Sequence, residues 1–410
     1  MPDCIKDLES VVLPSLKIYI TKIYITDIKN LTTAGENYGS ILLSVNIVIE
    51  NGKTETIKAV AKAVPKNDFI KNFFMSSLTF KKELYFYQNV IPALKKFQTD
   101  QGMKELVDFT AEFYGGRLTL DSNQQEYADE DAVILMENLK VSGYQTMERT
   151  VGFDFDTTCL IIKNIAQFHA VPIAMRIKNP STFMELIKPY LHHTDLFTQS
   201  MPEEMQNSLT EDIIKLASEN PQCAPYVKAL KRKCESCYRS GKNPKIGREL
   251  FTTITHNDIW VNNLLIKFDE NGIPIGNKLV DYQFLNYDSL GKDLIFFLFD
   301  SVQNEVIKRK YDEILRIYHD TFISTLKRLN VDTTPYTYEK LLEELDFAAN
   351  NTFAIGQTFA MLRPIFAVKE SVNEVENLRD DNILQYKEPT KLHKEKLYML
   401  VEEFVKRKWI

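Results

Sequence analysis

The chain has 410 residues, enough for two or three lobes with sizeable hydrophobic cores, because a domain averages about 150 residues. Its 50 Lys and Arg residues against 56 Asp and Glu residues give a formal charge of −6 without a basic block, which argues against a nucleic-acid-binding surface. Scattered cysteines, an acidic N-terminus and the lack of an apolar run near about 18 residues favour a cytoplasmic protein without a signal peptide or membrane span.

The first third of the chain alternates apolar and polar residues with the period of β-strands. An Asn51-Gly52 pair between two such segments predicts a hairpin turn. Apolar residues spaced by three and four between residues 69 and 97 predict a helix that carries Glu83. An antiparallel sheet is expected in an N-terminal lobe of residues 1–139, with strands at 22–31, 40–50, 56–65, 117–122 and 132–139.

From residue 140 to residue 410 the apolar period becomes helical. Helices are predicted at 157–175, in the stretch 203–240, at 311–329 and across 338–366. One segment interrupts this pattern, because two short apolar strands flank an Asn271-Gly272 turn. The fold class expected is therefore α+β, with a mainly helical C-terminal lobe that contains one β-hairpin.

Oxygen-bearing side chains bracket that hairpin. Asp258 and Asn263 precede it in THNDIWVNN, and Asp281 follows it in VDYQ. Hard oxygen ligands suit Mg²⁺, which binds through one or two carboxylates plus substrate phosphates. This order of His, Asp, Asn and a later Asp is the one used in kinase catalytic loops.

The N-terminal lobe supplies further parts in the same order. Lys62 lies on the third predicted strand, where a kinase places the lysine that contacts the α- and β-phosphates, and Glu83 lies on the next helix, where its partner is expected. Between the first two strands, Gly35 and Gly39 can let backbone N–H groups approach phosphate, although their spacing is not G-x-G-x-x-G. The joint order favours a kinase.

The segments GENYGS, VAKAVP, ELYFYQNVIP, VILMENL, QFHA, THNDIWVNN, VDYQ and GKDL together resemble the insect ecdysteroid kinase-like proteins, of the choline and aminoglycoside kinase superfamily. The resemblance covers roughly residues 30–300. It implies a bilobal protein-kinase-like fold and a monomer that transfers phosphate from ATP, with Mg²⁺, to a hydroxyl of a small lipophilic molecule, an ecdysteroid or xenobiotic first.

The resemblance also implies roles for particular residues. Asp258 would be the catalytic aspartate, with Asn263 and Asp281 as metal ligands, and Lys62 would bind phosphate with Glu83 as its ion-pair partner. Met136 would be the gatekeeper, with the Glu137 carbonyl and the Leu139 N–H reading adenine. The phosphate loop would comprise Gly35, Glu36, Asn37, Tyr38, Gly39 and Ser40. Two residues depart from the family pattern: Asn257, where glycine is common, and Asn138, where an acid is common.

A protein kinase is disfavoured, because only eleven residues separate Asp281 from Asp293 and leave no room for a peptide-binding activation segment. A choline-like amino-alcohol kinase and a pseudokinase that binds nucleotide or a lipophilic ligand remain alternatives. The C-terminal aromatic residues could line an acceptor pocket, but core packing is the favoured interpretation for each: Phe347, Phe353, Phe359, Met361 and Phe366.

Other noticeable residues have plain structural interpretations. His256 should brace the backbone and His169 should be a hydrogen-bonded core histidine. Asp293 should cap a helix, and the resemblance adds a hydrogen bond to the catalytic loop. Cys234-x-x-Cys237 lacks further metal ligands nearby and should be ordinary helix cysteines. Trp260 could line the acceptor site or pack beneath the loop.

Overall fold

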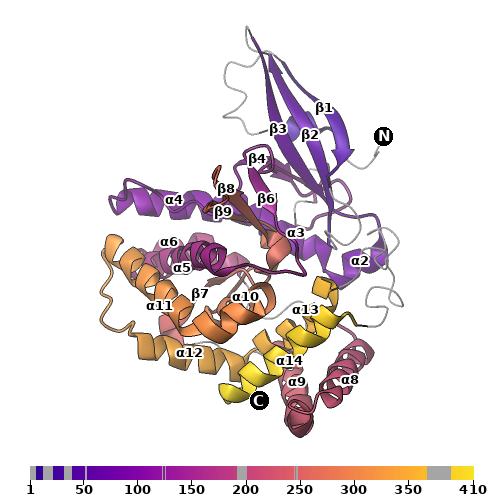
Figure 1. The fold of residues 1–410 in the computed structure, drawn as a ribbon. Helices are drawn as coiled ribbons and strands as arrows, with labels where there is room; N and C mark the ends of the chain where they lie inside the picture. Colours follow the sequence, from indigo (N-terminus) through magenta and orange to yellow (C-terminus); the bar gives the residue numbers. More distant parts are fainter. Residues whose placement is uncertain are drawn as a thin grey trace.

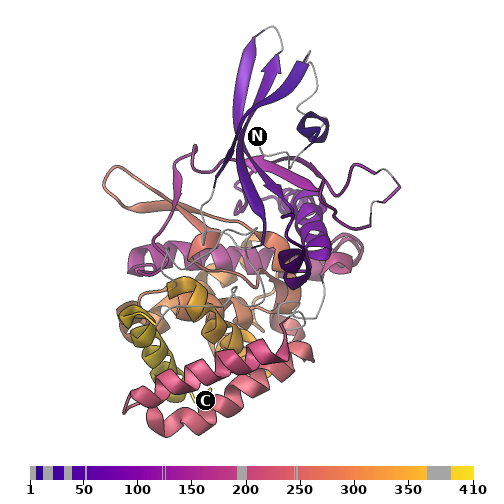
Figure 2. The same ribbon diagram turned by 90° about the vertical axis from the view of Figure 1, so that its right-hand side faces the viewer.

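The computed structural model of the chain describes residues 6–12, 22–31, 39–50, 53–121, 123–124, 126–191, 201–243, 245, 248–366 and 389–410. A twisted antiparallel sheet from the N-terminal part stands above a larger, mainly helical part in two perpendicular views (Figures 1 and 2). The predicted α+β class is therefore confirmed. The sheet ends at Glu137, and the lobe boundary near Leu139 stays a prediction.

Within the described residues, the N-terminal sheet has five strands in the order β1-β2-β3-β5-β4, with antiparallel neighbours throughout. One face of this sheet joins the main hydrophobic core through residues such as Val60 and Ile134, and the other face packs on Leu8 and Val11. The strands are β1 (Lys22–Asn30), β2 (Ile41–Glu50), β3 (Thr54–Ala63), β4 (Phe113–Arg117) and β5 (Val133–Glu137).

The fourth strand lies upstream of its predicted position, since the predicted 117–122 shares only Arg117 with β4. Glycine is rare inside strands, so the segment with Gly115-Gly116 did not have the composition of a strand. A Cβ on Gly116 would overlap Leu84 Cδ1, so glycine allows the helix to approach the sheet closely. Downstream, the Thr119 hydroxyl accepts from the Asp121 N–H at 3.0 Å, and this local turn replaces strand pairing.

The predicted helix of residues 69–97 consists of several pieces. α2 (Asp68–Phe73) ends before Met75, whose left-handed backbone (φ 49°) separates it from α3 (Ser76–Tyr85). A π-helical turn, η2 (Phe86–Val90), then joins α3 to α4 (Ile91–Asp100). The apolar period runs through all of these pieces, which is why it could not locate the breaks.

The helical part is built around α5 (Phe155–Lys178), which packs against α11 (Asn304–Arg328). In the part of the chain that the structure describes, α5 is the one helix long and apolar enough to cross a membrane, but 72% of its apolar window is buried inside the fold, as in a core helix. The other long helices are α8 (Glu203–Glu219), α9 (Val227–Lys242), α10 (Gly291–Ser301), α12 (Tyr338–Asn351), α13 (Ala354–Phe366) and α14 (Lys391–Lys406).

Short helical turns connect these elements. They are η1 (Leu8–Val11), α6 (Pro180–Thr182), η3 (Phe183–Ile187), η4 (Lys188–Tyr190), η5 (Ala224–Tyr226), η6 (Glu249–Phe251), η7 (Val261–Asn263) and η8 (Tyr282–Phe284). Helix α14 was not predicted from the sequence.

Two small sheets occur besides the large one among the described residues. The predicted hairpin is present as β8 (Leu264–Phe268) and β9 (Pro274–Leu279), and β6 (Tyr144–Thr146) pairs with β8 as a third strand. The other sheet pairs β7 (Thr252–Thr255) with β10 (Asn286–Ser289). The segments that follow β7 and β9 carry the predicted catalytic residues, so these sheets hold the site in place.

Gly291, at the start of α10, lies where α10 packs closely against α12. A Cβ on Gly291 would lie 2.7 Å from Ala348 Cβ and 3.2 Å from the Glu344 carbonyl oxygen on α12. We expect Gly291→Ala to destabilise the fold by about 1–3 kcal/mol, because α12 must move. Denaturant unfolding measures this, and the pair Gly291→Ala with Ala348→Gly should recover part of the loss. Equal stability of Gly291→Ala and the wild type would contradict the close contact.

Candidate active site

Lys62 joins parts of the chain that are far apart in sequence. Its ammonium on β3 donates to Glu83 Oε2 of α3 at 2.5 Å and to Asp281 Oδ1, after β9, at 2.7 Å. The other Glu83 oxygen accepts from the Tyr282 N–H at 3.3 Å. The side chains of Lys62 and Glu83 are only 4% and 0% exposed, so this is a buried charge cluster. The structure thus brings together three of the residues predicted from separate motifs.

Burial and the opposite charges nearby shift the pKa values of Lys62 and Glu83 in opposite directions. Burial alone would lower the pKa of Lys62, but the adjacent Asp281 and Glu83 carboxylates outweigh it and raise that pKa above its usual value. Burial raises the pKa of Glu83, while the Lys62 ammonium opposes the rise. Lys62 therefore stays fully charged at neutral pH.

Asp258 and Asn263 form a second group beside the first. The Asn263 amide donates from Nδ2 to Asp258 Oδ2 at 2.8 Å and to the Asp258 carbonyl at 2.9 Å. Burial and then the charge of Asp281 raise the pKa of Asp258 well above its usual value, and the hydrogen bond from Asn263 opposes the rise. A carboxylate with a raised pKa is a better proton acceptor than an ordinary aspartate.

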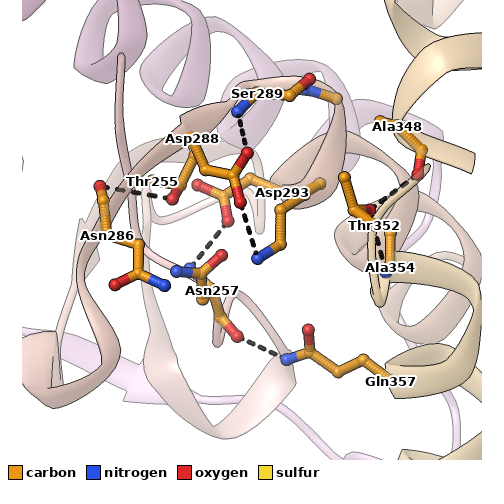
Figure 3. A network of polar contacts seen from close by, with 12 residues as sticks. Thr255, Asn257, Asn286, Asp288, Ser289, Asp293, Ala348, Thr352, Ala354 and Gln357 are labelled. Carbon is orange, nitrogen blue, oxygen red and sulfur yellow. Dashed lines mark hydrogen bonds and ion pairs between the residues drawn. The ribbon is translucent and has the colours of Figure 1, made fainter. Parts of the chain in front are cut away.

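Asp293 of α10 forms hydrogen bonds with the backbone just before Asp258. Its carboxylate accepts from the His256 N–H at 2.7 Å. It also accepts from the Asn257 N–H at 2.8 Å (Figure 3). It also lies 3.1 Å from His169 Nε2, whose Nδ1 is 2.8 Å from the Tyr318 hydroxyl. Although burial opposes its charge, the hydrogen bond from His169 and the other contacts lower the pKa of Asp293.

These contacts decide three of the structural interpretations. The bond from Asp293 to the loop is confirmed, but the helix-cap role is wrong, because Leu290 occupies the cap of α10 and Asp293 lies inside the helix. His169 is a hydrogen-bonded core residue, as expected. His256 is fully buried with Nε2 3.1 Å from the Val280 carbonyl, and burial lowers its pKa, which fits a neutral brace.

The conformation of Asn257 explains the first departure from the family pattern. Its φ is 61°, in the left-handed region that glycine adopts freely and asparagine tolerates better than other residues. Its amide donates to the Phe284 carbonyl at 2.9 Å, and its own carbonyl accepts from Gln357 of α13 (Figure 3). Asparagine therefore preserves the loop geometry that glycine would provide.

A cavity of about 190 Å³ opens between the large sheet and the catalytic loop. Apolar side chains such as Leu42, Val60 and Met136 line one part of it, and Lys62, Asn263 and Asp281 line another. An apolar slot next to a group of charges has the character of a nucleotide site, with the base in one part and the phosphates in the other. Asp258 lies next to this cavity through Asn263.

The predicted adenine-binding residues lie at the edge of the cavity. Glu137 and Leu139 both line it, with Met136 at the end of the same strand. The Leu139 carbonyl accepts from the Tyr144 N–H at 3.0 Å, and the Leu139 N–H has no hydrogen-bond partner among the described residues. Asn138, the second departure from the family pattern, accepts from the Lys140 N–H at 3.2 Å through its side-chain oxygen, a contact that a carboxylate could also make.

The phosphate loop is described only in part. Gly35, Glu36, Asn37 and Tyr38 lie outside the described residues. Ser40 is buried and lines the cavity, and a Cβ on Gly39 would lie 3.2 Å from Gln283 Nε2, so the end of this loop is close to the segment that carries Asp281.

The oxygen atoms that remain suit a magnesium ion. Asn263 uses its nitrogen toward Asp258, which leaves Oδ1, and Asp281 uses Oδ1 toward Lys62, which leaves Oδ2. Both residues line the cavity. A carboxylate and an amide oxygen at the edge of a phosphate site match the ligands that Mg²⁺ takes together with water and substrate phosphates.

Other candidates belong to the core. Phe353, Phe359 and Phe366 are at most 8% exposed and pack in the main hydrophobic core, and Trp260 is 5% exposed and packs there too. Cys234 and Cys237 are buried on α9. Among the residues that the structure describes, no group of three or more His, Cys, Asp or Glu side chains is arranged to hold a metal ion.

One part of the cavity wall had no signal in the sequence. Residues 146–149 line the cavity because β6 pairs with β8, and the guanidinium of Arg149 donates to the Pro364 carbonyl of α13. Three residues in β6 are too few for a periodic signal, so only the long-range pairing reveals this wall.

A model of the ecdysteroid kinase-like family matches residues 34–331. The chain belongs to the ecdysteroid kinase-like family. The match covers most of the chain and confirms the resemblance of its motifs. Family membership makes this protein a kinase-like phosphotransferase of the class that acts on small molecules. No curated protein matches the chain in sequence.

Solved structures of small-molecule kinases also match, each at 11% identity. They include the GDP complex of a point mutant of aminoglycoside 2'-phosphotransferase-IIIa (TM-score 0.43, covering 93% of each chain) and the GDP and kanamycin complex of APH(2")-IIia (0.36, covering 77% of this chain and 88% of that one). A choline/ethanolamine kinase family protein from Mesorhizobium loti matches with a TM-score of 0.31, over 91% of this chain and 93% of that one. The fold itself follows from the strand order and the helices.

The left-handed backbone at Asn257 gives a matched pair of variants. Asn257→Gly should keep the loop and its activity nearly unchanged, while Asn257→Ala should lose about 1–2 kcal/mol of stability, because alanine has no side-chain hydrogen bond and is strained at positive φ. Denaturant unfolding of both variants measures the difference. Two variants of equal stability would show that the backbone angle is not the constraint.

The raised pKa of Asp258 predicts a pH-dependent gain in stability on its removal. The pKa of Asp258 is higher in the folded than in the unfolded chain. At pH values between these two pKa values the unfolded chain binds fewer protons, so rising pH destabilises the wild type through this residue. Asp258→Asn should therefore melt at a higher temperature than the wild type at pH 8. This advantage should shrink as the pH falls toward about 4, the usual range of a carboxyl group. A lower melting temperature for the variant at pH 8 would contradict the raised pKa.

Proposed function

We propose that this protein transfers the γ-phosphoryl group of ATP to a hydroxyl of a small lipophilic molecule, an ecdysteroid or a xenobiotic first. The observation that carries the proposal is the buried contact of Lys62 with Glu83 and Asp281, next to the hydrogen-bonded pair of Asp258 and Asn263. Membership of the ecdysteroid kinase-like family supports the substrate class. We further propose that it works as a monomer in the cytoplasm.

The cavity suits ATP as the phosphate donor. The adenine would lie against Val60 and Met136, with the Glu137 carbonyl and the Leu139 N–H as its hydrogen-bond partners. Lys62 would contact the α- and β-phosphates, as its position in β3 beside the cavity allows. Asn263 and Asp281 would hold Mg²⁺, which when bound neutralises charge on the phosphates.

In the proposed transfer step, Asp258 accepts the proton of the acceptor hydroxyl. The acceptor hydroxyl donates a hydrogen bond to the Asp258 carboxylate, which aims the oxygen at the γ-phosphorus. As the new O–P bond forms and the bond from phosphorus to the ADP oxygen breaks, the hydroxyl proton passes to Asp258. Asn263 holds the carboxylate in position through its amide. The products are the phosphate ester and ADP, and the proton leaves Asp258 to solvent.

Each alternative makes a different demand on the site. A pseudokinase needs no complete set of reacting groups, yet Lys62, Asp258, Asn263 and Asp281 are all present and assembled. A choline-like amino-alcohol kinase needs acidic and aromatic residues around a cationic headgroup. Whether a cationic headgroup can bind next to Asp258 therefore depends on the charged residues around it.

Two substitutions should separate chemistry from nucleotide binding. Asp258→Asn should leave ATP affinity nearly intact and reduce turnover at least about 100-fold, because the proton acceptor is lost. Asp281→Ala should weaken Mg·ATP binding itself. Calorimetry with ATP and a coupled ADP assay measure the two effects, with Asp312→Asn, an exposed change on α11, as the control. Near-normal turnover in Asp258→Asn would refute the assignment.

The substrate class is testable directly. The wild type, incubated with Mg·ATP and a library of ecdysteroids, xenobiotic alcohols and amino alcohols, should give products heavier by one phosphate with the first two classes. Mass spectrometry scores the gain, and Asp258→Asn serves as the inactive control. Products from amino alcohols alone would favour the choline-like alternative, and absence of any product would favour the pseudokinase.

A further inference from the structure

Lys82, next to Glu83 on α3, is a buried lysine whose ammonium contacts the chain beyond Asp281. It is 3% exposed. Its Nζ donates to the Leu285 carbonyl at 2.6 Å and to Asn286 Oδ1 at 3.4 Å. Burying an ammonium is costly unless acceptors replace the water that it loses, so these contacts are needed for as long as the lysine stays inside. Lys82 therefore fixes the position of Leu285 relative to α3.

Helix α3 holds both ends of the short turn η8, which follows Asp281. At the first residue of this turn, the Tyr282 N–H donates to Glu83 Oε1 at 3.3 Å. Just after the turn, the Leu285 carbonyl accepts from Lys82. Two consecutive residues of one helix thus bind the two ends of η8, and α3 packs against it. Moving the turn away from α3 would break both hydrogen bonds.

Asp281 depends on this turn because its backbone is left-handed. Its φ is 68° and its ψ is 65°, a region that costs free energy for residues other than glycine, although aspartate tolerates it better than most. Such a conformation persists only where surrounding contacts enforce it. Helix α3 supplies two such contacts, and Asn257 of the catalytic loop adds another by donating to the Phe284 carbonyl at 2.9 Å. Lys82 therefore helps to keep Asp281 in the conformation that directs its carboxylate to Lys62.

Lys82 has no direct place at the proposed nucleotide site. It does not line the cavity that Lys62 and Asp281 share. Its ammonium binds the turn, whereas the ammonium of Lys62 contacts Asp281 itself. A change at Lys82 would therefore reach the site through the turn, and not through a lost contact with a ligand in that cavity.

We propose that Lys82 is a positioning residue, which holds the turn after Asp281 against α3 and so keeps the Asp281 carboxylate in place for Mg²⁺. This inference rests on the proposed function, since it takes Asp281 as a ligand of that ion. If the turn is released, the site loses a metal ligand but keeps Lys62 and the apolar part of the cavity for ATP. Loss of Lys82 should therefore weaken the binding of ATP with Mg²⁺ more than the binding of ATP alone.

The test compares Lys82→Met with Lys81→Met in the full chain. Methionine keeps an unbranched apolar stem but has no ammonium. Lys81 is the neighbouring lysine on α3, and its Nζ lies 5.9 Å from the ring centroid of the exposed Tyr127. In calorimetry, Lys82→Met should bind Mg·ATP at least about 10-fold more weakly than the wild type and bind ATP with EDTA within about 2-fold. Lys81→Met should change neither affinity.

Two further measurements exclude a merely structural role. Saturating Mg²⁺ should restore most of the turnover lost in Lys82→Met, because Asp281 is displaced rather than removed. Hydrogen exchange of the peptide that spans residues 281–286 should be faster in Lys82→Met than in Lys81→Met. The inference is overturned by wild-type Mg·ATP affinity in Lys82→Met, by an equal loss of ATP affinity with and without Mg²⁺, or by unchanged hydrogen exchange.

A second variant keeps the test decisive in case Lys82→Met does not fold. Lys82→Gln retains a polar side chain, but its amide nitrogen is one atom closer to the backbone than Nζ of lysine and falls short of the Leu285 carbonyl. It should show the same selective loss of Mg·ATP affinity. Wild-type Mg·ATP affinity in Lys82→Gln would overturn the inference as well.

The outcomes separate this inference from the proposed function. If the wild type phosphorylates alcohols and Lys82→Met has the same dependence on Mg²⁺, the inference fails and the function stands. If Lys82→Met selectively loses Mg·ATP affinity while the wild type transfers phosphate to no acceptor, the positioning role stands and the kinase function fails.

Discussion

The site depends on one buried ammonium shared between two carboxylates. Lys62 connects the large sheet, helix α3 and the segment after β9, and burying these charges is favourable only while all of them stay together. Removing one partner of a buried ion pair typically costs about 3–5 kcal/mol, because the other charge is left unpaired. When ionised, the cluster carries one more negative than positive charge. This excess negative charge would attract the proposed Mg²⁺ to Asp281, and the proposed Mg²⁺ would in turn let anionic phosphates bind to an overall acidic protein.

A second group of charges has a different task. Asp293 accepts hydrogen bonds from the loop backbone and from His169, and these contacts lower its pKa, so it is a permanent anion that shapes the backbone. Asp258 has its Asn263 contacts and a raised pKa, so it can change its protonation state during a reaction. Burial alone would give both acids similar properties. The number of hydrogen bonds distinguishes the acid that holds the loop from the acid proposed to take the proton.

The sequence could predict the elements whose signals are local. Alternation located β2 and β3, and the Asn271-Gly272 turn located the β8–β9 hairpin. The order of motifs singled out five candidate site residues that the structure brings together: Lys62, Glu83, Asp258, Asn263 and Asp281. It failed where local preference and tertiary contact disagree. Gly115-Gly116 is a poor strand sequence, but β4 forms there because Gly116 admits Leu84. The left-handed residue Met75 and the π-turn after α3 leave the apolar period intact, so no pattern could reveal them.

Helix α13, near the C-terminus, contacts the candidate site directly. Gln357 of α13 donates to the Asn257 carbonyl, and Arg149 in the cavity wall donates to the Pro364 carbonyl of the same helix. Helix α13 also packs against both α10 and α14. Helix α13 therefore connects the loop before Asp258 with one wall of the cavity. Asp293 holds the same loop independently from α10, so two helices fix the backbone just before Asp258.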